Sequence, residues 1–221
     1  MIYGSKPVDD GNFFLTDDER LEIVETDPIA AKYIKQILSS HEFINGLTRW
    51  CIWLENIDPT DYQKSKFIMS RLQAIRDFRF KSPKRSVRNQ AETPNLFSEI
   101  RQPKYDYIII PRHSSENRKY IPFGFFNADV IVSDSCLALP NATRFHFGVI
   151  TSQLHHVWVR YTCGRIKSDY RYSNILVYNN FPWPESPTEA QKQAVEEAAQ
   201  LVLDTRAKYP GSSLATLYNP L

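Results

Sequence analysis

Apolar residues recur at helical spacing in the first third of the chain and again near its end. A helix is expected from Thr16, because Thr16 and Glu19 match the capping-box pattern. A second helix is expected over residues 28–38, and a long amphipathic helix over residues 58–81. Residues 188–207 predict a fourth amphipathic helix.

Strand patterns fill most of the middle of the chain. The dipeptide Asn45-Gly46 lies between two apolar runs and predicts a β-hairpin over residues 42–54. Further strands are expected over residues 105–111, 120–126, 130–139 and 175–178. Residues 147–163 predict another helix, which Gly164 would end in a left-handed conformation.

The order of these elements is helices, then strands, then helices, without regular βαβ alternation, which indicates an α+β fold. We expect a mixed, largely antiparallel curved sheet with flanking helices and a C-terminal helical segment. The chain is expected to divide into a linker at residues 1–14, a central domain at 15–184 and the helical segment at 185–221. Residues 81–95 lack apolar periodicity and are expected to form a basic, mobile loop.

Charge is distributed unevenly along the chain. The net charge is only +2, but residues 61–120 hold fourteen basic and six acidic side chains. Concentrated positive charge favours an anionic partner such as nucleic acid. A solvated helix face rich in Lys and Arg explains the same pattern equally well.

Motifs for catalysis and cofactor binding are missing from the sequence. No two of the seven glycines have the spacing of a dinucleotide or phosphate loop, and no HExxH, GxSxG or CxxC occurs. The three cysteines lack metal-ligand spacing, so we expect reduced, partly buried thiols and no metal. The adjacent pair His155-His156 is interpreted as helix packing or a phosphate contact. We therefore expect no catalysis and no cofactor in this chain.

Membrane insertion and secretion are not indicated. No apolar run reaches the roughly 20 residues of a membrane-spanning helix, and the N-terminus lacks the apolar stretch of a signal peptide. A cytoplasmic location is expected.

Two runs in the last quarter of the central domain carry a family resemblance. They are Cys-Gly-Arg-Ile-Lys-Ser-Asp-Tyr-Arg-Tyr-Ser at residues 163–173 and Val-Tyr-Asn-Asn-Phe-Pro-Trp-Pro at 177–184. Together with Arg-Trp-Cys-Ile-Trp-Leu at 49–54 and Phe-Gly-Val-Ile-Thr-Ser at 147–152, they resemble the target-recognition region of MmeI-like methyltransferases. The resemblance extends from about residue 4 to the C-terminus.

The resemblance implies a part of a single-chain restriction-modification enzyme. Such an enzyme would methylate adenine N6 in duplex DNA with S-adenosylmethionine, and it can also contain a nuclease. The methyl-donor and catalytic motifs would precede Met1, so this chain would hold the DNA reader only. The implied partners are double-stranded DNA and the methyltransferase domain of the same parent chain. The alternative is a protein-interaction domain that docks the methyltransferase and nuclease parts.

The resemblance also implies base-reading residues. Lys167 and Asp169 lie two positions apart, and in an extended segment such side chains project to the same side. Lysine can donate to guanine O6 and N7 while aspartate accepts from cytosine N4, so the pair would read one base pair. Arg171 would reach a neighbouring base, and Ser135 resembles a second specificity position. A plain surface ion pair and a core serine are the competing interpretations.

Phosphate contacts are expected from basic and hydroxyl side chains in loops. The candidates are Lys84, Arg85, Arg88, Arg112, Ser114, Ser115, Arg118, Lys119 and Arg165. The nearby aromatic residues Tyr170, Tyr172 and Phe181 are expected to pack within the protein rather than stack on bases.

Overall fold

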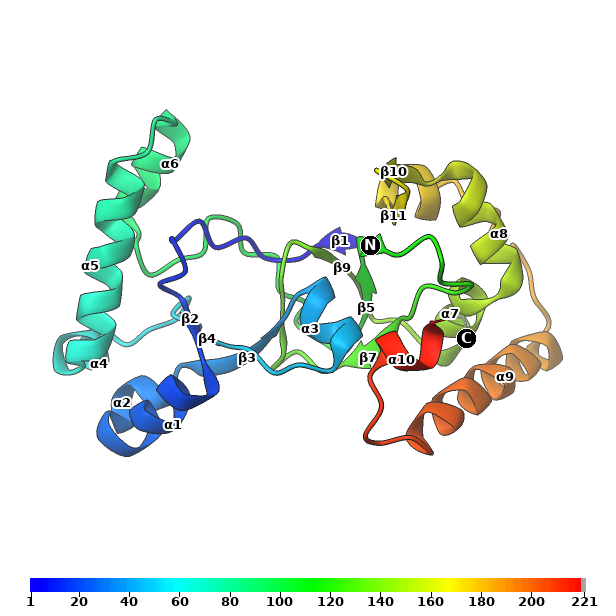
Figure 1. Ribbon diagram of the computed structural model, residues 1–221, viewed down its shortest axis with the longest axis horizontal. Coiled ribbons are helices and arrows are strands. Elements are labelled where there is room, and N and C mark those ends of the chain that lie inside the picture. Colours follow the sequence, from blue (N-terminus) through cyan, green and yellow to red (C-terminus); the bar gives the residue numbers. More distant parts are fainter. Residues whose placement is uncertain (220–221) are drawn as a thin grey trace.

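The computed structural model describes residues 1–219, which form three small sheets with helices at both ends of an elongated molecule (Figure 1). The last two positions of the expected C-terminal segment, 220–221, lie outside the described residues. The mixture of helices with antiparallel and mixed sheets confirms the α+β prediction. Within residues 1–219, no helix combines the length and apolar character needed to cross a membrane.

The central sheet is antiparallel and buried on both faces. Its strands run in the order β1 (Ile2–Tyr3), β9 (Cys136–Pro140), β5 (Tyr107–Pro111) and β7 (Gly124–Phe126). Alternate residues of β5 enter different cores. Ile108 packs in the core with α7 (Arg144–Thr151) and α9 (Glu189–Ala207), whereas Ile109 packs in the core with α3 (Ser40–Asn45) and α10 (Leu214–Tyr218). This burial explains the uninterrupted isoleucine run.

The second sheet carries the N-terminal helices. Its strands run in the order β2 (Phe14–Leu15), β4 (Trp50–Ile52), β3 (Ile34–Leu38) and β8 (Ile131–Val132). The associated helices are α1 (Asp17–Thr26), α2 (Pro28–Ala31), α4 (Pro59–Lys64), α5 (Lys66–Phe80), α6 (Arg85–Asn89) and the 3₁₀ turn η1 (Gln90–Glu92). Because β8 continues into β9 through the turn at residues 133–135, that turn joins the two sheets.

The third sheet consists of β10 (Gly164–Ile166), β11 (Asp169–Arg171) and β6 (His113–Ser114), all antiparallel. It follows α8 (Gln153–Thr162) and precedes a π-helix, η2 (Asn174–Tyr178). In Figure 1 the β10–β11 hairpin and α6 lie at opposite ends of the molecule, both above the central sheet.

Several predicted elements are confirmed. Helix α1 begins at Asp17 with the expected capping box on Thr16, and β5 and α9 lie where the patterns placed them. The expected helix over 58–81 is present but is interrupted at Ser65, which ends α4 and caps α5. The helix over 147–163 is likewise divided at Ser152, which caps α8.

Other predictions are wrong. Residues 34–38 form strand β3 rather than continuing the helix from Pro28, because they pair with β4 on one side and β8 on the other. The Asn45-Gly46 dipeptide ends helix α3 with Gly46 at φ 66°, so there is no hairpin over 42–54. Gly164 belongs to strand β10, without a left-handed backbone.

Three further segments also differ from expectation. Residues 81–95 are not a simple loop, because they contain α6 and η1. Residues 175–178 lie in the π-helix η2 rather than in a strand. Residues 1–14 are attached to the core, since β1 pairs with β9 and Gly4 N donates to Cys136 O at 3.1 Å. The division of the chain at residues 14 and 184 stays a prediction.

The buried polar residues beneath the third sheet serve packing. His155 Nε2 lies 2.9 Å from the Tyr172 hydroxyl, and His156 Nε2 accepts from Ile121 N at 2.7 Å. Burial lowers the pKa of His155 to about 3 and the pKa of His156 to about 4. Both rings are therefore neutral packing groups and not phosphate contacts. Burial also raises the pKa of the free thiols Cys51 and Cys136 to about 12.

Acid should destabilise the fold through these two histidines. In the unfolded chain they take up protons below a pKa of about 6.5, whereas in the folded chain they stay neutral until the pKa values of about 3 and about 4 are reached. We expect the free energy of unfolding to fall by roughly 2–3 kcal/mol between pH 7 and pH 5.5, where carboxylates stay ionised. Urea denaturation at a series of pH values measures this.

The matched control is the double variant His155→Leu with Tyr172→Phe, which replaces both partners of one hydrogen bond. It should halve the pH slope between pH 7 and 5.5, because only His156 is left to titrate. An unchanged slope would assign the pH dependence to other groups.

Candidate nucleic-acid interface

The candidate site is built around the turn Ser133–Ser135, where the first two sheets meet. Arg112 follows β5, and its backbone N donates to Ser135 O at 3.1 Å while its Nη1 donates to Asp134 O at 2.7 Å. The Arg112 guanidinium also lies 4.9 Å from the ring centre of Tyr3 on β1. Arg112 is thus partly engaged by the protein rather than free for a phosphate.

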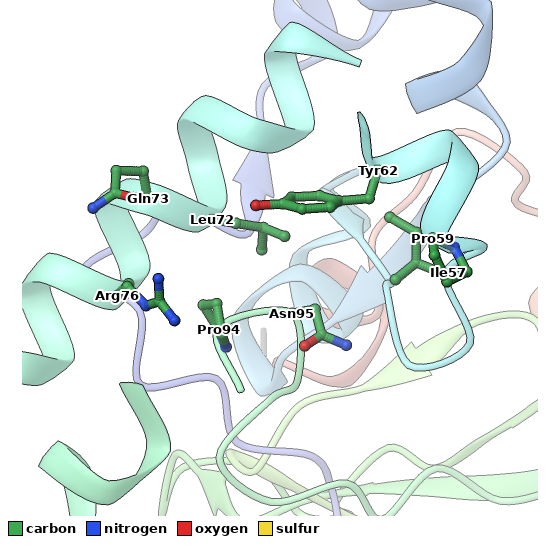
Figure 2. A pocket seen from close by; sticks show the side chains of 8 residues that line it. All are labelled: Ile57, Pro59, Tyr62, Leu72, Gln73, Arg76, Pro94 and Asn95. Carbon is green, nitrogen blue, oxygen red and sulfur yellow. The ribbon is translucent and has the colours of Figure 1, made fainter. Parts of the chain in front are cut away.

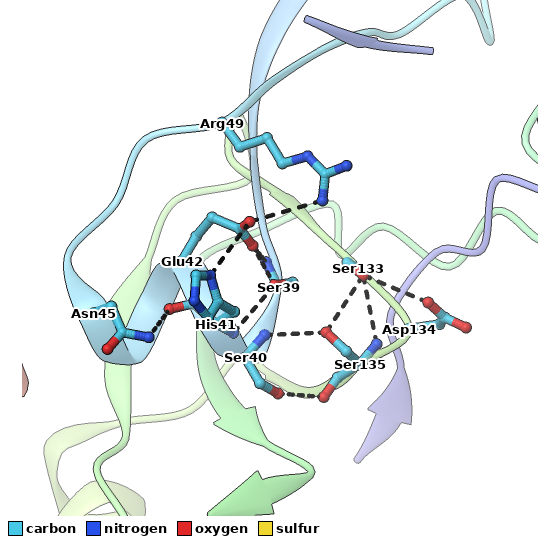
Figure 3. Close-up of polar contacts among 9 residues, drawn as sticks. All are labelled: Ser39, Ser40, His41, Glu42, Asn45, Arg49, Ser133, Asp134 and Ser135. Carbon is cyan, nitrogen blue, oxygen red and sulfur yellow. Dashed lines mark hydrogen bonds and ion pairs between the residues drawn. The ribbon is translucent and has the colours of Figure 1, made fainter. Parts of the chain in front are cut away.

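Helix α3 fixes this turn from the other side (Figure 3). Ser40 N donates to Ser135 Oγ at 3.0 Å, and Ser40 Oγ donates to Ser135 O. The first turn of α3 is stabilised by Glu42, which accepts from the backbone N and the hydroxyl of Ser39. Although burial opposes ionisation, these hydrogen bonds keep the pKa of Glu42 below its usual value. Ser135 is therefore half-buried and held in place on two sides.

The contribution of α3 was missed by the sequence analysis. The signal for it was present, because Ser39 and Glu42 match a capping box, Ser-x-x-Glu. The Asn45-Gly46 dipeptide is also typical of a hairpin turn, and for this reason the prediction of a hairpin in this segment was wrong.

The charged residues of the third sheet lie on an exposed hairpin. Ile166 pairs with Asp169 across a two-residue loop of Lys167 and Ser168. Lys167 has a left-handed backbone, with φ 55°. The assumption of an extended segment from Lys167 to Asp169 is therefore wrong, because the first residue lies in the turn. Both side chains are nevertheless exposed.

Asp169 and Arg171 form the pair that shares one face of a strand. They flank Tyr170, which is only 6% exposed and packs into the core. Because side chains alternate along a strand, Asp169 and Arg171 project together to the exposed side. Arg171 pairs with His113, and Tyr172 N donates to Arg112 O at 2.8 Å. Backbone hydrogen bonds thus connect the hairpin to Arg112 and, through it, to Ser135.

The remaining residues of this region have mixed environments. Arg165 lies over the Tyr170 ring at 3.9 Å and its Nη1 donates to Ser168 O at 2.9 Å, so it stabilises the hairpin. Ser114 is buried at 4% exposure. Ser115 accepts from Arg118 N at 3.2 Å inside a turn, and Lys119 is exposed.

The other basic group is remote from the hairpin. Lys84, Arg85 and Arg88 are exposed on and just before α6, at the far end of the molecule (Figure 1). Arg88 Nη1 donates to the carbonyls of Ser82 at 2.8 Å and Pro83 at 2.9 Å, which anchors the start of that helix. The predicted phosphate contacts therefore fall into two separate groups.

A cleft of about 400 Å³ lies outside the predicted site (Figure 2). It is lined by α4, α5 and the segment at residues 94–95, with Tyr62, Gln73 and Arg76 among its polar groups. None of the predicted site residues lines it. Among residues 1–219 there is also no cluster of three His, Cys, Asp or Glu side chains that could hold a metal ion.

Comparison with known proteins identifies relatives of the whole chain. Residues 1–185 match the family described as the MmeI target recognition domain, and residues 187–221 match the MmeI C-terminal domain. DNA methyltransferase A of Bacillus subtilis (strain 168) is 36% identical over 220 residues, which is 100% of this chain and 25% of that protein.

A solved structure agrees with these matches. The Type IIL restriction-modification enzyme MmeI in complex with DNA superposes with a TM-score of 0.96 at 43% identity, covering 99% of this chain and 29% of that one. The chain thus spans between a quarter and a third of the length of these relatives. These findings confirm the resemblance drawn from the sequence: the chain belongs to the MmeI family, through its target recognition domain and its C-terminal domain.

Proposed function

We propose that this chain recognises a specific sequence in duplex DNA. The observation that carries the proposal is the exposed trio Lys167, Asp169 and Arg171 on a hairpin whose backbone is hydrogen-bonded to the segment of Arg112. A two-stranded hairpin fits the major groove, where each base pair presents a distinct set of donors and acceptors. The relationship to MmeI, which was solved in complex with DNA, supports the same function.

The side chains of the hairpin suit the edges of a G·C pair. Asp169 can accept from cytosine N4, and Lys167 can donate to guanine O6 and N7. Arg171, on the same strand face as Asp169, is proposed to contact a neighbouring base. Ser135 is proposed as a further base contact, although its hydroxyl already accepts from Ser40 N at 3.0 Å.

Phosphate contacts are proposed for the two basic groups. Around the hairpin they are Ser115 and Lys119, and on the distant arm they are Lys84, Arg85 and Arg88. Arg112 and Arg165 are engaged by protein groups and Ser114 is buried, so these three residues are not proposed as phosphate contacts. Contacts of this kind supply affinity and salt dependence without sequence information.

The chain is proposed to act within a longer site-specific DNA methyltransferase. The relatives are several times longer and one is a DNA methyltransferase. In that setting the methyltransferase domain of the parent chain would bind S-adenosylmethionine and methylate adenine N6. This chain would select the site and perform no chemistry itself.

Exchange of the hairpin charges tests the function. The 221-residue chain is incubated with a library of randomised duplexes, and the bound DNA is sequenced. We expect the wild type to enrich one short motif, and Lys167→Glu with Asp169→Arg to alter the preferred base at one position by about 10-fold or more. A domain that only docks other protein parts would enrich no motif.

The matched control removes charge on the distant arm. Lys84→Glu should weaken binding to all duplexes alike, because a phosphate contact carries no base preference. It should also reduce the slope of log binding constant against log salt concentration by about one. A changed motif in this control would contradict the proposed division between base and phosphate contacts.

A further inference from the structure

We propose that Arg118 is a positioning residue for Asp169, and that the loop at residues 113–119 thereby helps to decide which base pair the hairpin accepts. This inference rests on the proposed function. It replaces the phosphate contact that the sequence predicts for Arg118.

Arg118 and Asp169 face the same small space. A cleft of about 310 Å³ lies between α3 and the strands β6 and β11, and both side chains line it. Asn45 and Ile44 of α3 form its opposite wall. The two charged residues are far apart in sequence, and the pairing of Tyr170 with Ser114 brings their segments together.

The loop holds one oxygen of the carboxylate directly. Glu116 N donates to Asp169 Oδ1 at 3.1 Å. The loop itself is shaped by Ser115, whose carbonyl accepts from Arg118 N at 3.2 Å and whose hydroxyl accepts from Asn117 N at 3.3 Å. One carboxylate oxygen is thus fixed by a backbone donor, which leaves the other oxygen to accept from a base.

The guanidinium of Arg118 supplies the matching positive charge. Its Nε is shielded from solvent and has no hydrogen-bond partner in the described structure, and neither has the hydroxyl of Ser114 beside it. Burial lowers the pKa of Arg118, and the negative charge of Asp169 acts against that shift. Its side chain lines the same cleft as Asp169, where the two opposite charges interact without a direct ion pair in the described structure.

A positive charge at position 169 would be unfavourable beside this loop. A cation there would face Arg118, and the backbone N–H of Glu116 would lose its acceptor. Because neighbouring charged residues that line one cleft do not contribute additively, the new base preference of a variant with a cation at position 169 should be stronger when position 118 changes as well.

The test is a cycle of variants in the duplex-library selection. Arg118→Gln should weaken the preference at the one position read by Asp169 by about 10-fold and leave the other positions unchanged, whereas Arg118→Lys should keep it. Lys167→Glu with Asp169→Arg should bind its new site at least about 10-fold more tightly when Arg118→Glu is added. Arg160→Gln is the control for a general disturbance of the loop, because the exposed Arg160 donates to Lys119 O at 3.2 Å.

Two results would overturn the inference while leaving the proposed function intact. One is a uniform loss at all positions in Arg118→Gln, which indicates a phosphate contact. The other is that Lys167→Glu with Asp169→Arg binds its new site equally well with and without Arg118→Glu. A wild-type chain that enriches no motif would instead refute the proposed function, and the inference with it. Thermal unfolding of each variant separates these results from loss of fold, and Arg118→Lys preserves the charge if Arg118→Gln fails to fold.

Discussion

Replacing Arg79 with leucine is expected to lower the free energy of unfolding by about 3–5 kcal/mol, because it removes a buried guanidinium and leaves all of its hydrogen-bond partners unpaired. Arg79 on α5 is 0% exposed. Its guanidinium donates five hydrogen bonds to backbone carbonyls at 2.7–3.1 Å, those of Pro7, Val8, Gln90, Thr93 and Leu96. Leucine would leave these carbonyls buried without a donor.

Arg76→Leu, one turn earlier on α5, is the matched control. Arg76 is exposed and donates one hydrogen bond, to Ala91 O at 3.2 Å. Its loss should cost about 1 kcal/mol. Urea denaturation followed by circular dichroism measures both variants, and similar losses in the two would contradict the structural role assigned to Arg79.

Gly4→Ala is expected to have the second largest effect, a loss of about 3 kcal/mol in stability. A Cβ on Gly4 would lie 2.1 Å from Ser133 O and 2.6 Å from Val132 O, both backbone atoms that cannot move aside cheaply. Either β1 must leave the edge of β9 or the Ser133–Ser135 turn must shift. The second alternative would also weaken the base preference proposed for Ser135.

Gly164→Ala separates this steric effect from the general cost of replacing a glycine. Gly164 is the first residue of β10 in the hairpin, has no atom within 4 Å of an added Cβ and lacks a positive φ. Its replacement should change stability by less than about 0.5 kcal/mol. Thermal unfolding and the duplex selection should therefore distinguish the two alanines, and equal behaviour would argue against the close approach of Gly4 to the turn.

Elements that are specified by neighbouring residues in the sequence were predicted correctly. The capping box on Thr16 and the apolar period of α9 depend on neighbouring residues only, and both were correct. The segment at residues 34–38 failed because pairing with two distant strands outweighed a helical spacing. Asn45-Gly46 failed for another reason, since a tight turn and a helix C-terminus both require positive φ at glycine.

The exposure of the charged residues in the candidate site was predictable, but their geometry was not. That Lys167 and Asp169 are exposed followed from their charge. The left-handed backbone of Lys167, and hence the shared face of Asp169 with Arg171, depends on the register of the hairpin. The contact of Glu116 with Asp169 joins residues that are 53 positions apart, and no local pattern reports such a contact.

The stability of the hairpin depends little on which exposed side chains it carries. Its cross-strand bonds are made by the backbone, and Tyr170 provides the anchor in the core. The side chains of Lys167 and Arg171 are exposed, so their replacement should cost little stability, except by β-branched residues at position 167, where φ is 55°. Under the proposed function, descendants of one ancestral gene would diverge in the sites they select while inheriting the same scaffold. Position 169 would change more slowly, because its neighbours contact its carboxylate.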